Sequence, residues 1–321
     1  MAEERVQIRE WDITPPHSFD FQLRHYVIAP EVREGDTLVQ VFRLLSGRLV
    51  KVDVESRGSV EAPALELGVA CDSRLSGPDI AEIRSRVGWH LCLDEDLRPF
   101  YERVASDPVL SASVTFNYGA KDKSAYSLFD AVIDCICAQN TQFRRLYAMR
   151  RNLAAAFGDR LEVEGRVYHA SPTPEQLAAA PLDAIRACGV GYRDRYIKAV
   201  AEAVVGGVDF DAIRRLARDQ ARRELTGLPG VGPYTADLAL IIGARRRDWM
   251  PLDVYIREAL RQFYFDGAAV ADEELRAFAA RAWGPYQGYA ALYLTTNTDL
   301  WAADAGKTFR LRSGARSDAF S

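Results

Sequence analysis

The sequence predicts an α+β protein in which an antiparallel β domain precedes a body of short helices. Residues 37–58 alternate apolar and polar side chains on both sides of a Ser46-Gly47 turn, which is typical of a β-hairpin, and residues 61–71 add a further strand. Helical periodicity begins at Pro78 and covers nearly everything after Ser127. With 321 residues, 48% of them hydrophobic, the chain can bury the cores of two or three domains.

These patterns divide the chain into three parts. Residues 1–115 form the predicted antiparallel β-rich domain with its flanking helix, and residues 116–305 form the predicted helical domain. Residues 306–321 are polar, and we expect a frayed tail there.

Composition narrows the class of protein. The chain has no long apolar run and starts with the charged segment MAEERVQIREWD, so we expect a soluble intracellular protein without a membrane anchor. The five cysteines are scattered and the four histidines lack metal-ligand spacing, which favours buried thiols over a disulfide or zinc framework. Because the formal net charge is −4, any contact with phosphate must be local.

The segment LPGVGPYTAD, residues 228–237, lies between two predicted helices. A helix ends at Gly227, and Pro233 suits the first position of the next helix. Gly230 and Gly232 then occupy the connection, where glycines allow positive φ and let backbone N–H groups point outward at a helix start. Such a turn either binds an anion such as a phosphate or simply packs two helices closely together.

The wider pattern resembles a known family. After the LPGVG turn comes PLDVYIREAL, which places Asp253 at a helix start, and together they are similar to the helix-hairpin-helix (HhH-GPD) DNA glycosylase superfamily. Three more segments, CAQNTQFRRLYAMRRNLAAAFG, CGVGYRDRYIKAVA and WGPYQGYAALYL, resemble the 8-oxoguanine DNA glycosylases in the same order. The resemblance covers residues 125–300 and reaches the β domain only in general pattern.

The resemblance implies a role for each matched residue. Asp253 would stabilise the positive charge that builds on the sugar when an N-glycosidic bond breaks. Such enzymes flip the base out of the duplex and fill the gap. The remaining matched positions are expected to bind DNA, with the hairpin residues Gly230, Val231 and Gly232 on a phosphate. Asn140 would enter the vacated space, and Tyr192 would insert as a wedge beside the orphaned base. Arg145 and Arg193 would hydrogen-bond that base. Each has an ordinary structural alternative as a packing, capping or solvated residue.

One departure from the family concerns the reaction. Family members that also cut the strand carry a lysine in the second hairpin helix, and its amine attacks C1′. Tyr234 stands at that position, and no lysine lies between the hairpin and Asp253. We therefore expect a monofunctional glycosylase that uses water and leaves an abasic site, as 3-methyladenine DNA glycosylase II does.

A second departure concerns the damaged base. Residues that hold 8-oxoguanine in the family are replaced here by Leu238, Tyr255, Ala291 and Thr295. The aromatic residues Tyr234, Trp249 and Tyr255 are expected to stack on an electron-poor alkylated purine. The retained Asn140, Arg145 and Arg193 set implies cytosine opposite the lesion and hence a damaged guanine; methylated adenine opposite thymine stays open.

The expected partner is double-stranded DNA with a damaged base, bound by a monomer in the cytoplasm on nucleoid DNA, or in the nucleus of a eukaryote. Catalysis would need no cofactor, an iron-sulfur cluster is not expected, and a monovalent cation at the hairpin is implied by the family. We expect Arg245, Arg246 and Arg247 either to contact phosphate or to be solvated. Two alternatives remain: an oxidised-guanine glycosylase with weak strand cleavage through another amine such as Lys198, and a non-catalytic damaged-DNA binding module.

Overall fold

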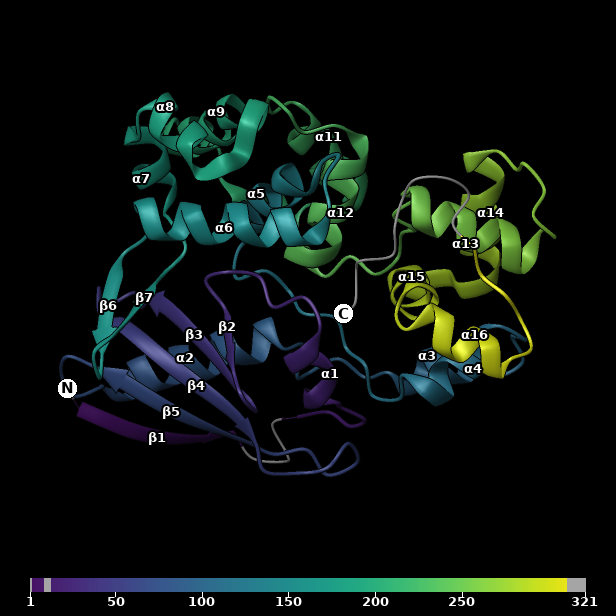
Figure 1. Ribbon diagram of the computed structural model, residues 1–321, viewed down its shortest axis with the longest axis horizontal. Coiled ribbons are helices and arrows are strands. Elements are labelled where there is room, and N and C mark those ends of the chain that lie inside the picture. Colours follow the sequence, from purple (N-terminus) through teal and green to yellow (C-terminus); the bar gives the residue numbers. More distant parts are fainter. Residues whose placement is uncertain (1, 9–12, 311–321) are drawn as a thin grey trace.

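The computed structural model describes residues 2–8 and 13–310. Figure 1 shows three parts: a sheet with one long helix across it, a helical body above the sheet, and a smaller group of helices to one side. The predicted order, an antiparallel sheet followed by helices, is confirmed. In the described part of the chain, no helix combines the length and the apolar character that a bilayer crossing requires.

The N-terminal sheet is antiparallel, with strand order β1-β5-β4-β3-β2. The predicted hairpin is β3 with β4, in register from Leu38 opposite Val54 to Arg43 opposite Leu49. One face of the sheet packs its apolar side chains against α2, because alternate residues of each strand point to the same side. The elements of this part are β1 (Ala2–Ile8), α1 (Phe19–Arg24), β2 (Val32–Glu34), β3 (Thr37–Arg43), β4 (Leu49–Ser56), β5 (Leu65–Cys71) and α2 (Gly77–His90).

The helical body is built around α5, which is apolar on nearly every face and is buried between α6, α9 and α12. The helix predicted before the glycine turn is α11, and Pro233 is the first residue of α12, as expected. Its helices are α5 (Leu128–Ala138), α6 (Phe143–Phe157), α7 (Pro174–Ala179), α8 (Leu182–Ile185), η2 (Arg186–Val190), η3 (Gly191–Arg193), α9 (Asp194–Val205), α10 (Phe210–Arg215), α11 (Arg218–Thr226) and α12 (Pro233–Ala244).

The third part contains helices from both predicted domains, packed together in one core, so the expected boundary at residue 115 is wrong. Phe100 and Leu110 pack with Trp283 and Trp301 in one buried cluster that is separate from the core of the sheet. The apolar sides of the two short helices that contain Phe100 and Leu110 are therefore covered by C-terminal helices. The elements here are α3 (Arg98–Val104), α4 (Leu110–Phe116), α13 (Val254–Tyr264), α14 (Asp272–Trp283), η4 (Gly284–Tyr286), α15 (Gln287–Thr295) and α16 (Thr298–Asp304).

A small hairpin inside the helical body, β6 (Arg160–Val163) with β7 (Arg166–His169), was not predicted. Its sequence signal is the two-residue turn Glu164-Gly165, in which both residues have positive φ, as a tight hairpin turn requires. Val163 and Tyr168 pack on Val39 and Val41 of the sheet, so the hairpin fastens the helical body to the sheet.

The polar C-terminal segment departs from the expected frayed tail in its first residues. Lys307 N donates to Ala302 O at 2.7 Å, and Arg310 N donates to the side-chain oxygen of Gln262 at 3.0 Å. Residues 306–310 are therefore attached to α13 and α16. The rest of the expected tail, residues 311–321, lies outside the described residues.

A buried ion pair joins the sheet to the segment before α5. Lys123 Nζ donates to Glu31 Oε2, and His90 Nε2 lies 2.8 Å from Glu31 Oε1. Burial opposes ionisation of Glu31, but the charge of Lys123 and the contact with His90 outweigh it and hold the pKa of this carboxyl below its ordinary value of 4.5. Removing either partner leaves the other charge buried alone.

We expect Lys123→Met to lower the free energy of unfolding by about 3–5 kcal/mol at pH 7, because Glu31 loses its partner. Since the pKa of Glu31 is lowered on folding, the stabilisation exists above the ordinary value of 4.5 and is lost as pH falls below it. The difference between wild type and variant should therefore shrink in acid. Urea unfolding at pH 7 and pH 4 measures it, with Arg98→Met of the exposed Arg98–Asp96 pair as control. An equal loss in both variants would contradict the prediction.

Candidate active site

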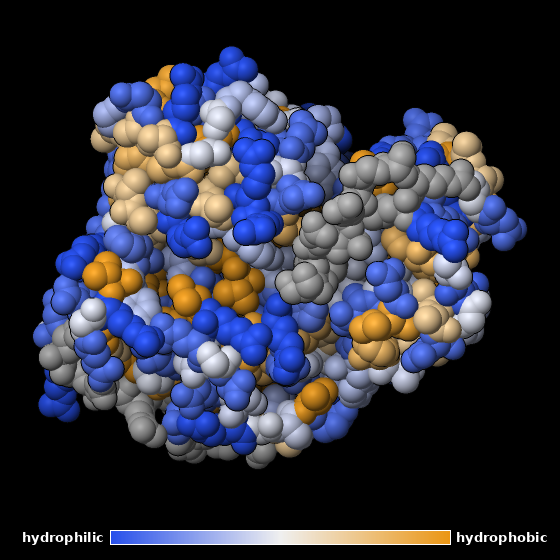
Figure 2. Space-filling model, viewed as in Figure 1, coloured by the Kyte–Doolittle hydropathy of each residue, from blue (hydrophilic) through white to orange (hydrophobic). Residues whose placement is uncertain are grey.

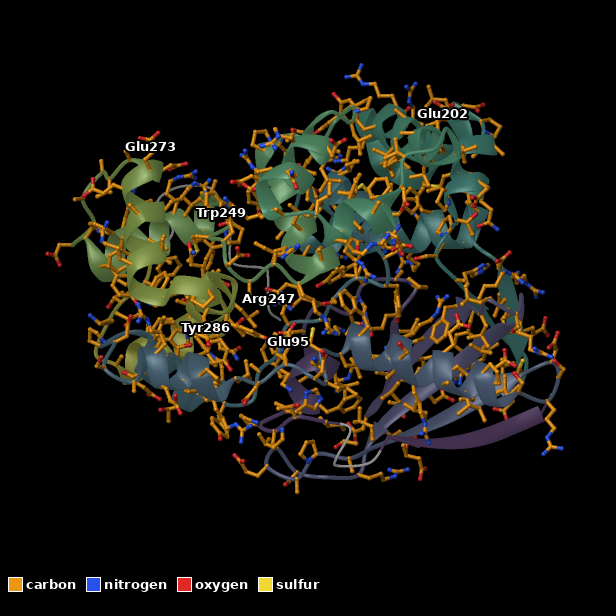
Figure 3. All side chains as sticks on the ribbon, turned by 180° about the vertical axis from the view of Figure 1, so that it is seen from behind. Glu95, Glu202, Arg247, Trp249, Glu273 and Tyr286 are labelled. Carbon is orange, nitrogen blue, oxygen red and sulfur yellow. The ribbon has the colours of Figure 1, made fainter. Side chains whose placement is uncertain are left out.

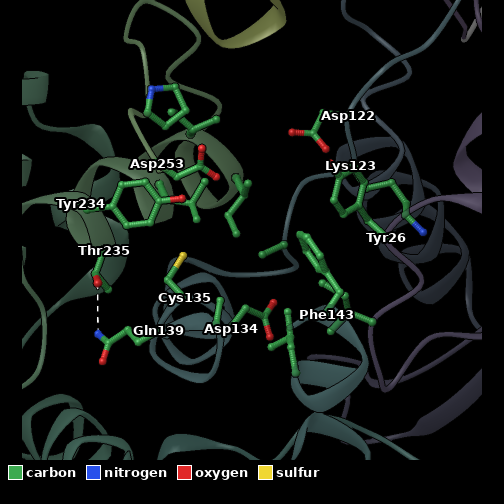
Figure 4. Close-up of a pocket in the computed structure, with 18 of the residues that line it drawn as sticks. Tyr26, Asp122, Lys123, Asp134, Cys135, Gln139, Phe143, Tyr234, Thr235 and Asp253 are labelled. Carbon is green, nitrogen blue, oxygen red and sulfur yellow. Dashed lines mark hydrogen bonds between the residues drawn. The ribbon is translucent and has the colours of Figure 1, made fainter. Parts of the chain in front are cut away.

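A cavity of about 900 Å³ opens where the three parts of the molecule meet. Figure 2 shows a mostly hydrophilic face, with apolar side chains gathered in the hollow between the sheet and the helices above it. Figure 4 shows the cavity with Asp253 and Tyr234 on one wall and Tyr26 and Lys123 on the opposite one. The C-terminal half of α5 and the start of α6 form its floor.

Asp253 is the N-cap of α13, as the sequence predicted. Its Oδ1 accepts a hydrogen bond from the backbone N–H of Ile256 at 2.6 Å, which fixes the side chain at the cavity wall. Burial raises the pKa of the carboxyl above 3.8, while the amides of Ile256 and Tyr255 and the charge of Arg257 oppose the rise. The site therefore holds a carboxylate that is partly stripped of water but fixed by the helix start, and such a group stabilises positive charge strongly.

Tyr234 lies in the first turn of α12 and faces the cavity beside Asp253 (Figure 4). The loss of contact with water and the nearby negative charge of Asp253 raise the pKa of its phenol well above 10, so the hydroxyl group stays protonated and the side chain neutral. Its side chain is still 40% exposed, because it borders the open cavity rather than packed protein. At the position of the family's nucleophilic lysine there is thus a neutral aromatic ring.

The two other predicted pocket aromatics are placed differently. Tyr255 lines the cavity and follows Asp253 by two residues in the chain. Trp249 does not line it: its ring is stacked with the guanidinium groups of Arg218 at 3.7 Å and Arg276 at 4.9 Å. Figure 3 shows Trp249 in the connection between the helical body and the C-terminal helices. The prediction of Trp249 as a pocket residue is therefore wrong, because two arginines take up its ring.

Several cavity residues were not singled out from the sequence. Tyr26 and Phe143 make an edge-to-face pair at 5.7 Å on the wall opposite Tyr234, and the Cys135 thiol points into the space (Figure 4). Asp134 is paired with Arg150, whose Nε lies 2.5 Å from its Oδ1, and burial raises the pKa of Asp134 to about 7. Phe143 directly follows CAQNTQ in a segment that carries the resemblance, whereas Asp134 and Cys135 precede that segment and Tyr26 lies in the loop after α1.

One lysine lines the cavity, and it was also missed. Lys123 lies across from Asp253, but its Nζ points away from that residue and is bound by the Glu31 carboxylate (Figure 4). The amine named as an alternative, Lys198, does not line the cavity and donates to the carbonyls of Ala178 and Ala180 at 2.7 and 2.9 Å. Both amines are therefore held by other acceptors.

The glycine turn joins α11 to α12. Gly230 has φ +79°, and a Cβ atom there would overlap the ring of Tyr196; Gly232 has an ordinary φ of −80° and open space around it. Among the described residues the amides of Gly230 and Gly232 have no hydrogen-bond acceptor, whereas the amide of Val231 donates to Leu228 O. The turn thus presents free amides at the start of α12 from its two glycines, and Val231, whose side chain is buried, contributes none.

Gln139, which was not singled out from the sequence, links this turn to the other predicted DNA-contacting loops. Its side-chain amide donates to Gly230 O at 2.7 Å and to the Thr235 hydroxyl at 3.1 Å, the latter drawn in Figure 4. Its own carbonyl accepts from Arg193. The next residue, Asn140, is exposed at the cavity rim with a left-handed φ of 46°.

The remaining predicted contacts differ in exposure. Arg145 is exposed on α6, and Tyr192 is 45% exposed with its ring 4.7 Å from the Arg193 guanidinium. Arg193 is only 5% exposed and donates to Val190 O as well as to Gln139 O. These hydrogen bonds hold Arg193 against the loop that carries Tyr192. Its predicted contact with a base therefore requires these hydrogen bonds to break.

Comparison with known proteins finds a family match. The sequence pattern of the HhH-GPD superfamily of base excision DNA repair proteins matches residues 133–285, which include Asn140, Gly230 and Asp253. The chain is similar to the HhH-GPD superfamily over this segment. The resemblance stated from the sequence is thereby confirmed.

Proteins similar to this chain carry two kinds of name. A probable N-glycosylase/DNA lyase of Methanothermobacter thermautotrophicus is 28% identical over 72% of this chain and 78% of its own length. A DNA-3-methyladenine glycosylase of Bacillus subtilis is 27% identical over 63% of this chain and 67% of its own length.

Solved structures share the fold of this protein. The 3-methyladenine DNA glycosylase of Archaeoglobus fulgidus has a TM-score of 0.76 at 20% identity, covering 90% of this chain and 97% of its own. An 8-oxoguanine glycosylase/lyase of Clostridium acetobutylicum, solved with DNA that has cytosine opposite the lesion, has a TM-score of 0.66 at 19% identity, covering 88% and 100%.

The arginine cluster at residues 245–247 makes contacts within the protein, so the expectation that these residues are solvated is wrong. Arg245 donates to Asp94 at 2.7 Å, Arg246 donates to Leu216 O at 2.6 Å, and Arg247 is buried. Arg247 Nη2 lies 3.5 Å from Glu95, and Figure 3 shows the two together at the junction of the three parts. The cluster holds the parts together, because it ends α12 where polar groups from residues 88–95 surround it.

We expect the two hairpin glycines to fail differently when changed to alanine. Gly230→Ala should destabilise the fold, since its methyl group overlaps Tyr196 and its φ is positive. Gly232→Ala should leave the melting temperature nearly unchanged but weaken duplex DNA binding about tenfold, because the methyl group blocks the approach of a phosphate to the free amides.

Thermal unfolding and fluorescence anisotropy with an undamaged duplex measure the two effects. Gly165→Ala, in the β6–β7 turn, is the control for a glycine substitution at positive φ away from the DNA-contacting loops. Unchanged DNA affinity in Gly232→Ala would show that the turn only packs two helices.

Proposed function

We propose that this protein is a monofunctional DNA glycosylase of base excision repair. It would bind double-stranded DNA as a monomer, flip a damaged purine into the cavity, hydrolyse the N-glycosidic bond with water and leave an abasic site. The observation that carries the proposal is the juxtaposition of Asp253 and Tyr234 on one cavity wall, with no amine beside them among the described residues.

Asp253 fits the chemistry of the sugar. As the glycosidic bond breaks, positive charge develops at C1′, and a fixed carboxylate in a site of low water content stabilises it more in the transition state than in the ground state. The N-cap bond to Ile256 holds one carboxylate oxygen, and the group needs no reorganisation during the reaction. A binding module without catalysis gains nothing from this carboxylate, since it repels the DNA phosphates.

A monofunctional glycosylase does not cleave the strand, because it forms no imine with the sugar. Tyr234 cannot form one, and Lys123 and Lys198 are both held by other acceptors. The relative named as an N-glycosylase/DNA lyase favours the alternative, in which another amine reaches C1′ after the base has left.

An alkylated purine is the substrate class we propose. Tyr234, Tyr255, Tyr26 and Phe143 surround the space with aromatic rings, and an alkylated purine that carries positive charge is attracted to such rings. The relative named as a DNA-3-methyladenine glycosylase supports this class. The alternative of an oxidised guanine is opposed by the apolar or short side chains of Leu238, Ala291 and Thr295.

No cofactor is part of the proposed reaction. A monovalent cation could bridge the hairpin to a phosphate: the carbonyls of Leu228 and Gly230 each accept one hydrogen bond and keep a second lone pair. We propose that the protein acts where chromosomal DNA lies, on the nucleoid or in a nucleus.

We expect the protein to release an alkylated purine and to leave strands that break only after hot alkali. The test uses labelled duplexes with 7-methylguanine stabilised by 2′-fluorination, 1,N6-ethenoadenine, hypoxanthine, uracil or 8-oxoguanine, each opposite C and T. Asp253→Asn is the control, because asparagine also caps a helix, and its rate should fall at least about 100-fold. Breaks without alkali would refute the monofunctional mechanism, and the absence of any release would favour a binding module.

The rate of excision should depend on pH through Asp253. Because the carboxylate is the active form and its pKa is raised, the rate should fall towards acid with a midpoint above pH 3.8. Arg257→Gln removes a positive charge that lowers this pKa, so its midpoint should lie at still higher pH. Single-turnover rates between pH 4 and 8 measure both midpoints, and identical profiles would assign the titration to another group.

A further inference from the structure

The described residues after α16 turn back along α13. Gln262 Nε2 lies within hydrogen-bond distance of Arg310 O, and Gln262 Oε1 accepts from Arg310 N at 3.0 Å, so one side chain satisfies both backbone groups of Arg310. These bonds place the side chain of Phe309 on α13.

The face of α13 that receives this segment is defined by helical spacing. Tyr255, Gln262 and Phe263 are seven and eight residues apart, so they share one side of the helix. The Phe309 ring lies 4.8 Å from the Tyr255 ring and 5.7 Å from the Phe263 ring. Phe263 in turn contacts Trp301 at 5.2 Å, which gives a row of rings from the buried core to Tyr255.

Tyr255 is the last ring of this row and the one that borders the cavity. Phe309 contacts Tyr255 but does not line the cavity itself, so it supports the ring from outside the base-binding space. On the other side, Tyr255 follows Asp253 by two residues, so a shift of its ring alters the space beside the carboxylate.

We propose that Phe309 is a positioning residue of the base pocket, which holds the Tyr255 ring in the orientation that stacks on the flipped purine. The inference rests on the proposed function, because it gives Tyr255 a base to contact. It assigns to residues 307–310 a part in substrate selection, although the sequence marks them only as the start of a polar tail. Phe309 touches neither the base nor the sugar, and it acts only through Tyr255.

The test compares Phe309→Ala with Phe278→Ala. Phe278 is also partly buried in the C-terminal helices, where it contacts Tyr264, Phe265 and Trp283 but not Tyr255. Phe309→Ala should raise KM for excision of the preferred lesion about five- to tenfold and leave the affinity for undamaged duplex unchanged. Phe278→Ala should change KM less than about twofold. Equal changes in the two variants would overturn the inference.

A double-mutant cycle with Tyr255→Ala separates support through Tyr255 from a general loss of structure. In the Tyr255→Ala background, Phe309→Ala should add almost nothing to the loss of excision; additive losses would overturn the inference. NMR of 13C-labelled tyrosines provides a readout without DNA: the Tyr255 ring signal should shift in Phe309→Ala and not in Phe278→Ala. If that shift occurs but the wild type excises no lesion, the proposed function fails and the contact stands; an unshifted signal overturns the inference even where excision is observed.

Discussion

The hydrogen bonds of Gln139 are the contacts on which the arrangement of the loops proposed to contact DNA depends. Its side-chain amide holds the glycine turn at Gly230, and its backbone carbonyl holds Arg193 in the loop that carries Tyr192. Asn140 follows directly and has a left-handed conformation at the cavity rim. Three loops that are far apart in sequence are thereby fixed to the C-terminal end of one buried helix, α5. Rigid attachment of this kind is what a site needs to position a flipped nucleotide without further ordering.

The cavity combines two electrostatic environments. Asp253 has only amide and distant arginine partners, so burial raises its pKa. Glu31, which is more completely buried, has Lys123 and His90 in contact and therefore has a lowered pKa. The same pairing that stabilises the fold also occupies the one lysine on the described cavity wall. The difference leaves a carboxylate without an ion-pair partner at one wall and a lysine held in an ion pair with Glu31 at the other, which suits hydrolysis better than imine chemistry.

Polar contacts between the parts of the molecule explain the arginine-rich segment 245–247. A run of three arginines on an acidic protein suggests a phosphate contact, but the end of α12 lies against carbonyls and carboxylates of residues 88–95. Because these acceptors are partly buried, guanidinium groups that make several hydrogen bonds are the side chains that satisfy them. The β6–β7 hairpin makes a second, apolar connection between the helical body and the sheet. These two connections together fix the helical body to the rest of the molecule.

The sequence by itself determined the features that depend on neighbouring residues. Alternation gave the β3–β4 hairpin, the glycines and Pro233 gave the turn before α12, and the position of Asp253 gave a helix N-cap, because each is a local property of φ, ψ or side-chain direction. Only the tertiary structure decided which distant groups meet. Trp249 lies between two arginines, α3 and α4 pack with the C-terminal helices, and Tyr26 and Phe309 reach the cavity or its wall. Such contacts depend on the burial of whole surfaces across long sequence separations, and no local pattern encodes them.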